Sequence, residues 1–446
     1  MKFAFPFFIR GLKIMQKRTI LWDITDKCNL RCRHCYNADK YFSNKEYQVL
    51  NTTQINSVLA KLSRSGYNHV HLLGGEPLVR QDIWEIITAA GRRNIETTLN
   101  TNGTLLTTPN ISRLLSARNL SQIVVSLDGP TAAANDKIRG KGVFKNVTAN
   151  IRSLTAAIKK RRGKTITAVS SVISEDNAAE LHKFGALTAS LGVDYLFLLN
   201  MYDCGNARTE KLKSRNYFRE VLPHLVKAVK TFDEYPDLRV QLDAKPKLAT
   251  YLNRASGKKI VAIEPSVCRA GDNMLAMDPD GTLYPCGSFS QPQHQNNPVM
   301  DIPRAGVADV KQVNDFLTTK SFKNFLSLKA SAHTAYCKSC EFSAMCHGIC
   351  PLYAGAANIP SECEAVDYFQ GRLFAGMLPM SFTLARPDYQ GSNDVAALAL
   401  DLIKQGYPFR EILQRLNKKF KAGMPLLRRD IGGYISDLVV AGIIKR

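Results

Sequence analysis

Three cysteines lie close together near the start of the sequence, as Cys28, Cys32 and Cys35 in the segment "CNLRCRHC". Cysteine thiolates at such short spacing can bind a metal ion or an iron–sulfur cluster from a single loop. A closed structural zinc site needs four ligands, one more than this group supplies. The spacing therefore favours a [4Fe–4S] cluster held by three thiolates, with one iron left open to bind a substrate or a cofactor.

A second and denser group of cysteines lies in the last 40% of the chain, with four of its members in the segment "CKSCEFSAMCHGIC". The group consists of Cys268, Cys286, Cys337, Cys340, Cys346, Cys350 and Cys363. A zinc site built from the four dense cysteines would leave Cys268, Cys286 and Cys363 without a role. Further iron–sulfur clusters explain the whole group better.

Composition restricts the setting of these cysteines. The chain has 446 residues, 11 cysteines and a formal net charge of +22. An odd number of cysteines without an export signal predicts a cytoplasmic protein and argues against a disulfide framework. The positive charge favours anionic partners, although charge alone does not choose among nucleic acid, acidic peptides and phosphorylated cofactors. No apolar stretch reaches the roughly eighteen residues of a membrane span.

The first 18 residues hold five basic residues and no acidic ones, around the apolar run "FAFPFFI". A signal peptide would place its positive charge before a longer apolar core and a cleavage site of small residues. We therefore predict an extension of the first domain, with contact to a membrane surface or a partner as the alternative.

A parallel sheet is predicted to position the first cysteine group. The apolar segment 19–25 reads as a buried strand and leads directly into the cysteine loop. Five more strand segments alternate with helical patterns: 69–78, 97–103, 122–130, 165–173 and 193–200. This alternation indicates parallel pairing, and right-handed crossovers curl such a sheet. The expected fold class is α/β, with a partial (β/α)6 TIM-like barrel.

Glycine or polar motifs follow several of these strands, as in "GGEP" at 74–77 and "SLDGP" at 126–130. Barrel enzymes keep their chemistry at the C-terminal ends of the strands. Gly74 and Gly75 would let a ligand approach backbone amides closely. A tight turn would explain any one of these motifs, but together they predict a ligand across the barrel mouth.

The cysteine patterns resemble those of a known family. "CNLRCRHC" is similar to the cluster motif of the radical S-adenosyl-L-methionine (SAM) superfamily. The second group resembles the SPASM domain of that superfamily, including the spacing from Gly281 to Cys286. The resemblance covers residues 19 to about 368.

The resemblance implies which residues contact SAM. "GGEP" is similar to the segment that receives the amino group of SAM, which points to Gly75 and Glu76. "SLDGP" with the following "NDKIRG" resembles the ribose and carboxylate contacts, which points to Ser126, Asp128 and Arg139. An arginine is well suited to grip a carboxylate with two hydrogen bonds.

The resemblance also implies three [4Fe–4S] clusters, two of them auxiliary. Cys337, Cys340, Cys346 and Cys363 would hold one auxiliary cluster, and the set Cys268, Cys286 and Cys350 the other. The second set lacks a fourth cysteine, because "AIEPSV" precedes Cys268. An open iron, a non-cysteine ligand or Cys204 would complete it; otherwise Cys204 is a small buried residue. His34 is interpreted either as packing beside the adenine of SAM or as structural.

The tail shows helical spacing of apolar residues in three segments, preceded by a faint strand near 380–384 and followed by the apolar end "GIIK". This order predicts a small winged-helix-like unit. It resembles a PqqD-like element that binds the leader of a precursor peptide by strand addition. A structural cap and a nucleic-acid reader are the alternatives.

We therefore predict a radical SAM enzyme that acts on a ribosomally made precursor peptide and forms a C–C, C–O or C–S crosslink. Its partners would be that peptide and an electron donor such as flavodoxin or ferredoxin, with nucleic acid disfavoured. Alternatives are a formylglycine-forming sulfatase maturase and an iron–sulfur regulator that binds nucleic acid. The predicted domains are an extension (1–18), the radical SAM barrel (19–235), the SPASM region (236–368) and the tail (369–446).

Overall fold

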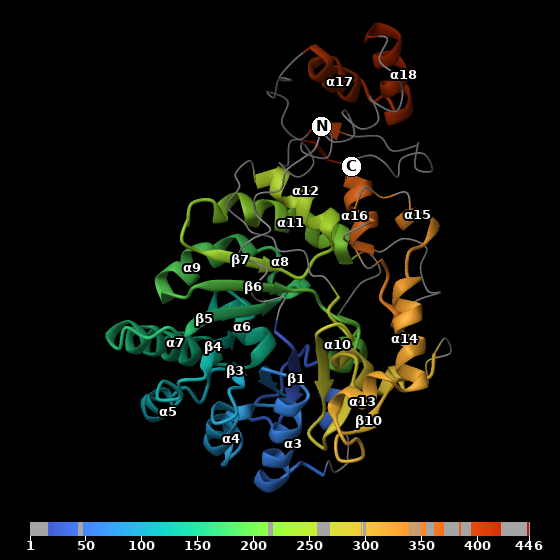
Figure 1. Ribbon diagram of the computed structural model, residues 1–446. Coiled ribbons are helices and arrows are strands. Elements are labelled where there is room, and N and C mark those ends of the chain that lie inside the picture. Colours follow the sequence, from blue (N-terminus) through green and yellow to red (C-terminus); the bar gives the residue numbers. More distant parts are fainter. Residues whose placement is uncertain are drawn as a thin grey trace.

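The protein is described here as a computed structural model (Figure 1). The described residues are 17–42, 48–212, 217–256, 268–295, 297, 300–338, 340, 342–343, 346, 348–353, 361–369, 383–384, 394–420 and 444–445. All structural statements below concern these residues.

The six predicted strands are present and lie side by side in the order of the sequence. They are β1 (Thr19–Asp23), β2 (His69–Leu73), β3 (Glu96–Thr101), β4 (Leu120–Ser126), β5 (Ile166–Val172) and β6 (Tyr195–Leu199). Each pairs in parallel with the next. The prediction of a parallel α/β sheet is thus confirmed.

The sheet is larger than the six strands predicted, because it extends at both edges. β7 (Arg239–Leu242) pairs in parallel with β6, and β8 (Met274–Met277) pairs in parallel with β1. β9 (Thr282–Tyr284) and the short β10 (Ala305–Gly306) complete a ten-stranded sheet with β10 and β7 at its edges. β8 and β9 pair antiparallel in a hairpin, which the alternating residues on both sides of the turn sequence Pro-Asp-Gly at 279–281 predict. The sheet therefore continues past the predicted domain boundary at residue 235.

The sequence contains only weak local signals for β7 and for the pairing of β8 with β1. β7 has only four residues and begins with the exposed Arg239. The β8–β9 hairpin was visible in the sequence, but its pairing with β1 joins residues about 250 positions apart. Local periodicity cannot reveal such a pairing.

Helices cover the outer face of the sheet, as Figure 1 shows. The principal ones are α3 (Thr52–Arg64), α4 (Ile83–Gly91), α5 (Thr108–Leu114), α6 (Ala132–Arg139), α7 (Val143–Lys160), α9 (Phe184–Leu191), α11 (Tyr217–Phe232) and α12 (Pro246–Ser256). α3 shows how they form. Asn51 caps its first turn in a capping box, and its apolar positions at helical spacing are buried.

The core lies between the strands and these helices. In β1, Ile20 and Trp22 are fully buried, whereas Asp23 at the strand end is partly exposed. Successive side chains of a strand point to opposite faces. Ile20 and Trp22 therefore pack beneath the helices, and Asp23 lies on the concave face.

The cysteine-rich region packs beside β8–β10. It contains α13 (Val313–Leu317), α14 (Lys320–Ala330), α15 (Ala335–Lys338) and α16 (Ser361–Phe369). Four phenylalanines form its core in a chain of edge-to-face contacts: Phe289, Phe316, Phe322 and Phe325. Such contacts add to the free energy gained by burying the rings.

The tail contains α17 (Asp394–Lys404) and α18 (Phe409–Phe420), which correspond to the first two predicted helices. The faint strand is β11 (Thr383–Leu384), which pairs antiparallel with β12 (Ile444–Lys445). The third predicted helix, at 431–438, lies outside the described residues. Among the residues described, we find no helix with the length and apolar character needed to cross a membrane.

Candidate active site

The C-terminal ends of the parallel strands meet at one edge of the sheet, as in other barrels. The cysteine loop 28–35 follows β1, the Gly-Gly-Glu turn follows β2, and Asp128 follows β4 shortly after Ser126. Arg139 ends α6, the helix after β4. The structure therefore brings these predicted residues to the same edge.

The three cysteines of the first loop lie within electrostatic range of one another. Burial above all, together with the nearby Cys32 and Cys28, raises the pKa of the Cys35 thiol to about 12. The Arg139 Nη1 atom lies 4.0 Å from the Cys32 sulfur, and the Asn102 side-chain nitrogen lies 3.9 Å from the Cys28 sulfur. Thiols in such a place ionise most readily when a metal binds them.

Close backbone packing holds this loop in place. A Cβ atom on Gly75 would lie 2.0 Å from the Lys27 carbonyl oxygen, and one on Gly205 would lie 2.2 Å from that of Cys35. Gly205 also has a φ of +54°, which glycine adopts without strain. Three free thiols in a rigid, half-buried loop fit a [4Fe–4S] cluster with one open iron.

Glu76 is fully buried, and its carboxylate is bonded within the protein. It accepts hydrogen bonds from the backbone N–H of Asn102 at 2.6 Å, the Thr101 hydroxyl at 2.7 Å and the backbone N–H of Leu78 at 3.1 Å. Burial raises the pKa of Glu76, and these hydrogen bonds oppose that shift. The side chain therefore ties the turn after β2 to the end of β3.

Asp128 is also fully buried and lies at the centre of a charged network. Its carboxylate is 2.7 Å from His34 Nε2, 2.6 Å from Arg139 Nε and 2.7 Å from the backbone N–H of Val172. Burial raises its pKa, but Arg139 and His34 lower it more, and the net pKa lies well below the ordinary value. His34 is therefore held by Asp128, as the structural interpretation predicts.

Four cysteines of the second group line one small cavity of about 20 Å³, namely Cys337, Cys340, Cys346 and Cys363. Lys245, Lys247, His333 and Tyr336 share its wall. The Lys245 ammonium donates to the Gly348 carbonyl at 2.8 Å. Burial lowers the pKa of Lys245, but Glu362 and then the cysteines at 346, 363 and 350 raise it, and the net pKa lies above the ordinary value. Lys247 forms an ion pair with Asp367 at 2.5 Å.

The other three cysteines of the second group form a separate set. Burial above all, together with Cys286 and Cys268, raises the pKa of Cys350 to about 12. Cys204 lies elsewhere, next to the first loop: the backbone N–H of the nearby Asn206 donates to the Cys35 carbonyl at 3.0 Å. Cys204 is 5% exposed.

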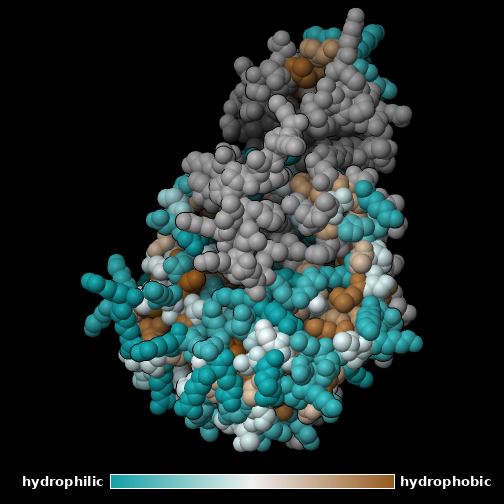
Figure 2. Space-filling view, in the orientation of Figure 1, coloured by the Kyte–Doolittle hydropathy of each residue, from teal (hydrophilic) through white to brown (hydrophobic). Residues whose placement is uncertain are grey.

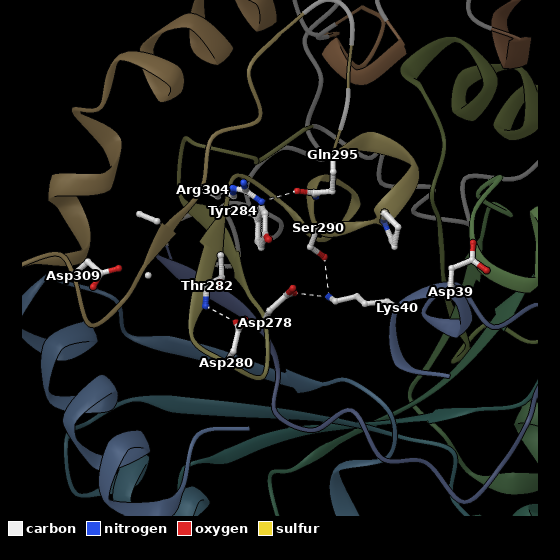
Figure 3. Close-up of a pocket in the computed structure, with 13 residues that line it drawn as sticks. Asp39, Lys40, Asp278, Asp280, Thr282, Tyr284, Ser290, Gln295, Arg304 and Asp309 are labelled. Carbon is white, nitrogen blue, oxygen red and sulfur yellow. Dashed lines mark hydrogen bonds and ion pairs between the residues drawn. The ribbon is translucent and has the colours of Figure 1, made fainter. Parts of the chain in front are cut away.

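A cavity of about 690 Å³ lies between α2 (Ala38–Tyr41) and the β8–β10 strands (Figure 3). The buried Lys40 points across it to Asp278 and, at 2.9 Å, to the Ser290 hydroxyl. Lys40 also lies 3.4 Å from Asp23 at the end of β1. Burial raises the pKa of Asp278 to about 7 although Lys40 lowers it. None of the predicted cluster or SAM residues is among the described residues that line this cavity.

The sequence did not single out Lys245, Lys247 or the Lys40–Asp278 pair. Lys245 and Lys247 flank Pro246 at the start of α12, a common helix start that carries no metal signal. The cysteines that they face lie about 90 to 120 positions later in the chain. A contact of this kind has no local sequence signature.

The sequence profile described as "Radical SAM superfamily" matches residues 22–196, from β1 to β6. The match contains the cysteine loop and all the strand ends described above. Residues 22–196 therefore resemble the radical SAM superfamily in sequence.

Two curated relatives show how far the similarity extends. The mycofactocin maturase MftC of Mycolicibacterium smegmatis is 32% identical over 173 residues, which is 39% of this chain and 42% of that protein. The AdoMet-dependent heme synthase of Methanosarcina barkeri is 26% identical over 282 residues, or 60% of this chain and 76% of that protein. This chain therefore spans less than half the length of the maturase.

Solved structures extend the likeness beyond the barrel. SuiB of Streptococcus suis bound to S-adenosylmethionine aligns with a TM-score of 0.59 at 15% identity, over 77% of this chain and 75% of that one. The AdoMet-bound anSMEcpe aligns with a TM-score of 0.58 at 18% identity, over 81% of this chain and 98% of that one. At these identities the likeness establishes the fold of the chain and leaves its substrate open.

Proposed function

We propose that this radical SAM protein modifies a ribosomally made precursor peptide and forms a C–C, C–O or C–S crosslink in it. The observation that carries the proposal is the gathering of ten cysteines into three sets on one radical SAM fold. The related MftC is named a maturase, and SuiB has been solved with a precursor peptide.

Cys28, Cys32 and Cys35 would hold the cluster at the barrel mouth. When bound, this cluster supplies the single electron that cleaves SAM and so starts hydrogen abstraction from the substrate. Arg139 and Asn102 lie beside two of the sulfurs and stabilise the negative charge of the thiolates. Asp128 orients Arg139 through their 2.6 Å ion pair.

The SAM contacts in this proposal are Gly75, Glu76, Ser126, Asp128 and Arg139. Glu76 and Asp128 act by positioning the residues around SAM, because both carboxylates already accept hydrogen bonds or form ion pairs within the protein. Gly75 presents its backbone, and Ser126 ends β4 opposite Ser170 of β5. Arg139 offers a guanidinium for the carboxylate of SAM.

Two auxiliary [4Fe–4S] clusters complete the proposed set of three. Cys337, Cys340, Cys346 and Cys363 would hold one, since they line one cavity. The set of Cys268, Cys286 and Cys350 would hold the other, with an open iron or a non-cysteine ligand. An electron donor such as flavodoxin or ferredoxin would supply the reducing electron.

The tail would bind the leader of the precursor peptide. Its support is a small unit in which β11 pairs with β12 and the helices α17 and α18 pack together. A short sheet, of which the described residues contain two strands, can accept a further, peptide strand at an edge. On α18 the exposed Arg415, Lys418 and Lys419 would attract an acidic leader.

A heme-synthase reaction on a tetrapyrrole is the second candidate. The named heme synthase matches 60% of this chain, more than the 39% matched by the maturase of M. smegmatis. A tetrapyrrole needs no leader-binding unit, so the tail favours the peptide.

Anaerobic reconstitution tests the proposal. The protein should bind about twelve irons, cleave SAM under reducing conditions and remove hydrogens from a short peptide encoded beside its gene. The triple Cys28→Ala, Cys32→Ala and Cys35→Ala variant should retain about eight irons and lose SAM cleavage. Four irons, or stoichiometric zinc, in the parent protein would contradict the auxiliary clusters. Conversion of a tetrapyrrole but of no peptide would establish the second candidate.

A further inference from the structure

One residue after β6 binds the cysteine loop at two of its three cysteines. Asn206 lies in α10 (Gly205–Thr209), the short helix that follows β6. Its backbone N–H donates to the Cys35 carbonyl at 3.0 Å, and its side-chain Nδ2 donates to the Cys32 carbonyl at 3.0 Å. The side-chain bond joins positions that are 174 residues apart in the chain.

Both carbonyl groups also accept a hydrogen bond from a residue nearby in the sequence. The Cys35 backbone N–H donates to the Cys32 carbonyl at 3.1 Å, and the Ala38 backbone N–H donates to the Cys35 carbonyl at 3.3 Å. Hydrogen bonds of such short range close turns, but they do not fix a turn relative to the rest of the barrel. Within the described part of the chain, Asn206 is the residue that reaches both carbonyls from a distant element.

The residue before Asn206 permits this close approach. Residue 205 is a glycine with a φ of +54°, and a Cβ atom there would lie 2.2 Å from the Cys35 carbonyl oxygen. A larger residue would push α10 away from the loop, and Asn206 with it. Asn206 is half-buried, so its hydrogen bonds are electrostatically stronger than they would be in water.

Arg33 makes other long-range contacts from this part of the loop. Its backbone N–H donates to the Ile138 carbonyl at 2.8 Å. Its side chain is 36% exposed and pairs with Asp176 at 2.5 Å and with Glu210 at 2.8 Å. Exposed ion pairs contribute little to stability. Asn206 therefore holds the backbone of the cysteines themselves, which the Arg33 side chain does not.

We propose that Asn206 is a positioning residue for the cluster that the first cysteine set would bind. It fixes the backbone of Cys32 and Cys35 and thereby opposes the local opening of the loop, which would release iron. Local openings have free energies of their own, below that of global unfolding. The net contribution of one hydrogen bond corresponds to about a fivefold change in such an opening equilibrium. This inference rests on the proposed function, because it requires a cluster at the first cysteine set.

Iron release from the reconstituted full chain tests the proposal. Asn206→Leu keeps the size of the side chain and the backbone N–H but removes the Nδ2 donor. With an iron chelator in excess under anaerobic conditions, about four of the roughly twelve irons should leave about fivefold faster than in the parent, and the others at the parent rate. Asn206→Asp also lacks the donor and should accelerate release at least as much, so it carries the same test if Asn206→Leu does not fold.

The matched control is Asn119→Leu. The Asn119 side chain donates to the Ile87 carbonyl at 3.0 Å, the Ile95 carbonyl at 3.2 Å and the Thr97 hydroxyl at 3.0 Å. Asn119 follows α5, over which the surface is largely hydrophilic (Figure 2). The length of β4, about 23 Å, separates it from the candidate active site. Iron release from this variant should match that from the parent, even if its free energy of unfolding falls.

Equal acceleration by Asn119→Leu would reduce the effect to global stability and overturn the proposal. In the triple variant Cys28→Ala, Cys32→Ala and Cys35→Ala, the added Asn206→Leu should leave iron release unchanged; faster release there would also overturn it, since the first cluster is absent. Release at the parent rate from Asn206→Leu with about twelve irons bound would overturn this proposal alone. If the parent and the triple variant hold equal iron, the first set binds no cluster, and the proposed function fails together with this inference.

Discussion

Asp128 shows how one buried carboxylate can organise the residues around it. The "SLDGP" motif predicts a direct SAM contact, and that contact stays a prediction. In the structure the carboxylate joins His34 of the cysteine loop, Arg139 of α6 and the backbone of β5. An arginine held in this way loses less conformational freedom when it binds a carboxylate. Asp128 is therefore a positioning residue of the candidate site.

The prediction at the residue scale concerns the charge of Lys245. Its ammonium lies near Cys346, Cys363 and Cys350, members of both auxiliary sets. A buried positive charge favours the more negative, reduced state of a nearby cluster. Lys245→Met should therefore shift the reduction potential of the auxiliary clusters to a more negative value, measured by a potentiometric titration followed by electron paramagnetic resonance.

The control for this prediction is Lys245→Arg, which keeps the charge and should stay close to the parent potential. Both lysine substitutions are made in the triple variant Cys28→Ala, Cys32→Ala and Cys35→Ala. Only the auxiliary clusters then contribute to the spectrum. Unchanged potentials in Lys245→Met at full iron content would exclude electrostatic tuning by this lysine.

At the scale of elements, Lys40 joins parts of the fold that are distant in sequence. It lies on α2 directly after the cysteine loop, is fully buried, and pairs with Asp278 beyond the end of β8 and with Asp23 at the end of β1. Removal of the cation would leave the buried Asp278 carboxylate without its ion pair, whereas Asp23 would keep the hydrogen bonds from Tyr41 and Asn37. The pair therefore fixes α2 against the β8–β9 hairpin.

Lys40→Met should lower the free energy of unfolding by about 3–5 kcal/mol, the usual cost of removing one partner of a buried ion pair. Anaerobic urea unfolding measures this change. Lys137→Met is the matched control, since Lys137 pairs with Asp176 at 2.5 Å but is 60% exposed. It should cost less than about 1 kcal/mol. If both variants lose a similar free energy of unfolding, burial does not make the Lys40 ion pair more stabilising than an exposed one.

At the scale of the whole molecule, one extended sheet connects the barrel to the cysteine-rich region. β8 pairs with β1, and Cys286 follows β9 two residues after the strand ends. The cysteine loop thus follows β1 and Cys286 follows β9 in the same sheet, with β8 between these two strands. The domain division at residue 235 stays a prediction, but the sheet crosses it.

The tail is the subject of the last prediction. β11 pairs with β12 and contacts α17, so a truncation that tests the tail should remove β11 as well. A chain that ends at Phe369, after α16, should keep its iron content and its SAM cleavage without substrate. Conversion of the full-length precursor should fall steeply and recover in part when the tail is added separately, since tethering mainly raises effective concentration. Loss of iron or of soluble protein on truncation would instead identify the tail as a structural cap.

Local patterns in the sequence determined the chemistry and much of the fold. The cysteine spacing indicated iron–sulfur clusters, because ligands within one loop are close in space whatever the rest of the chain does. The six parallel strands and the β8–β9 hairpin followed from periodicity and turn residues, which act over a few positions.

Only the tertiary structure decided which distant residues meet. It placed β8 beside β1, Lys245 beside cysteines about a hundred positions away, and Asp128 between His34 and Arg139. It also placed Asn206 of α10 on the carbonyl groups of Cys32 and Cys35. These contacts depend on long-range pairing and burial, and no local pattern of residues encodes either.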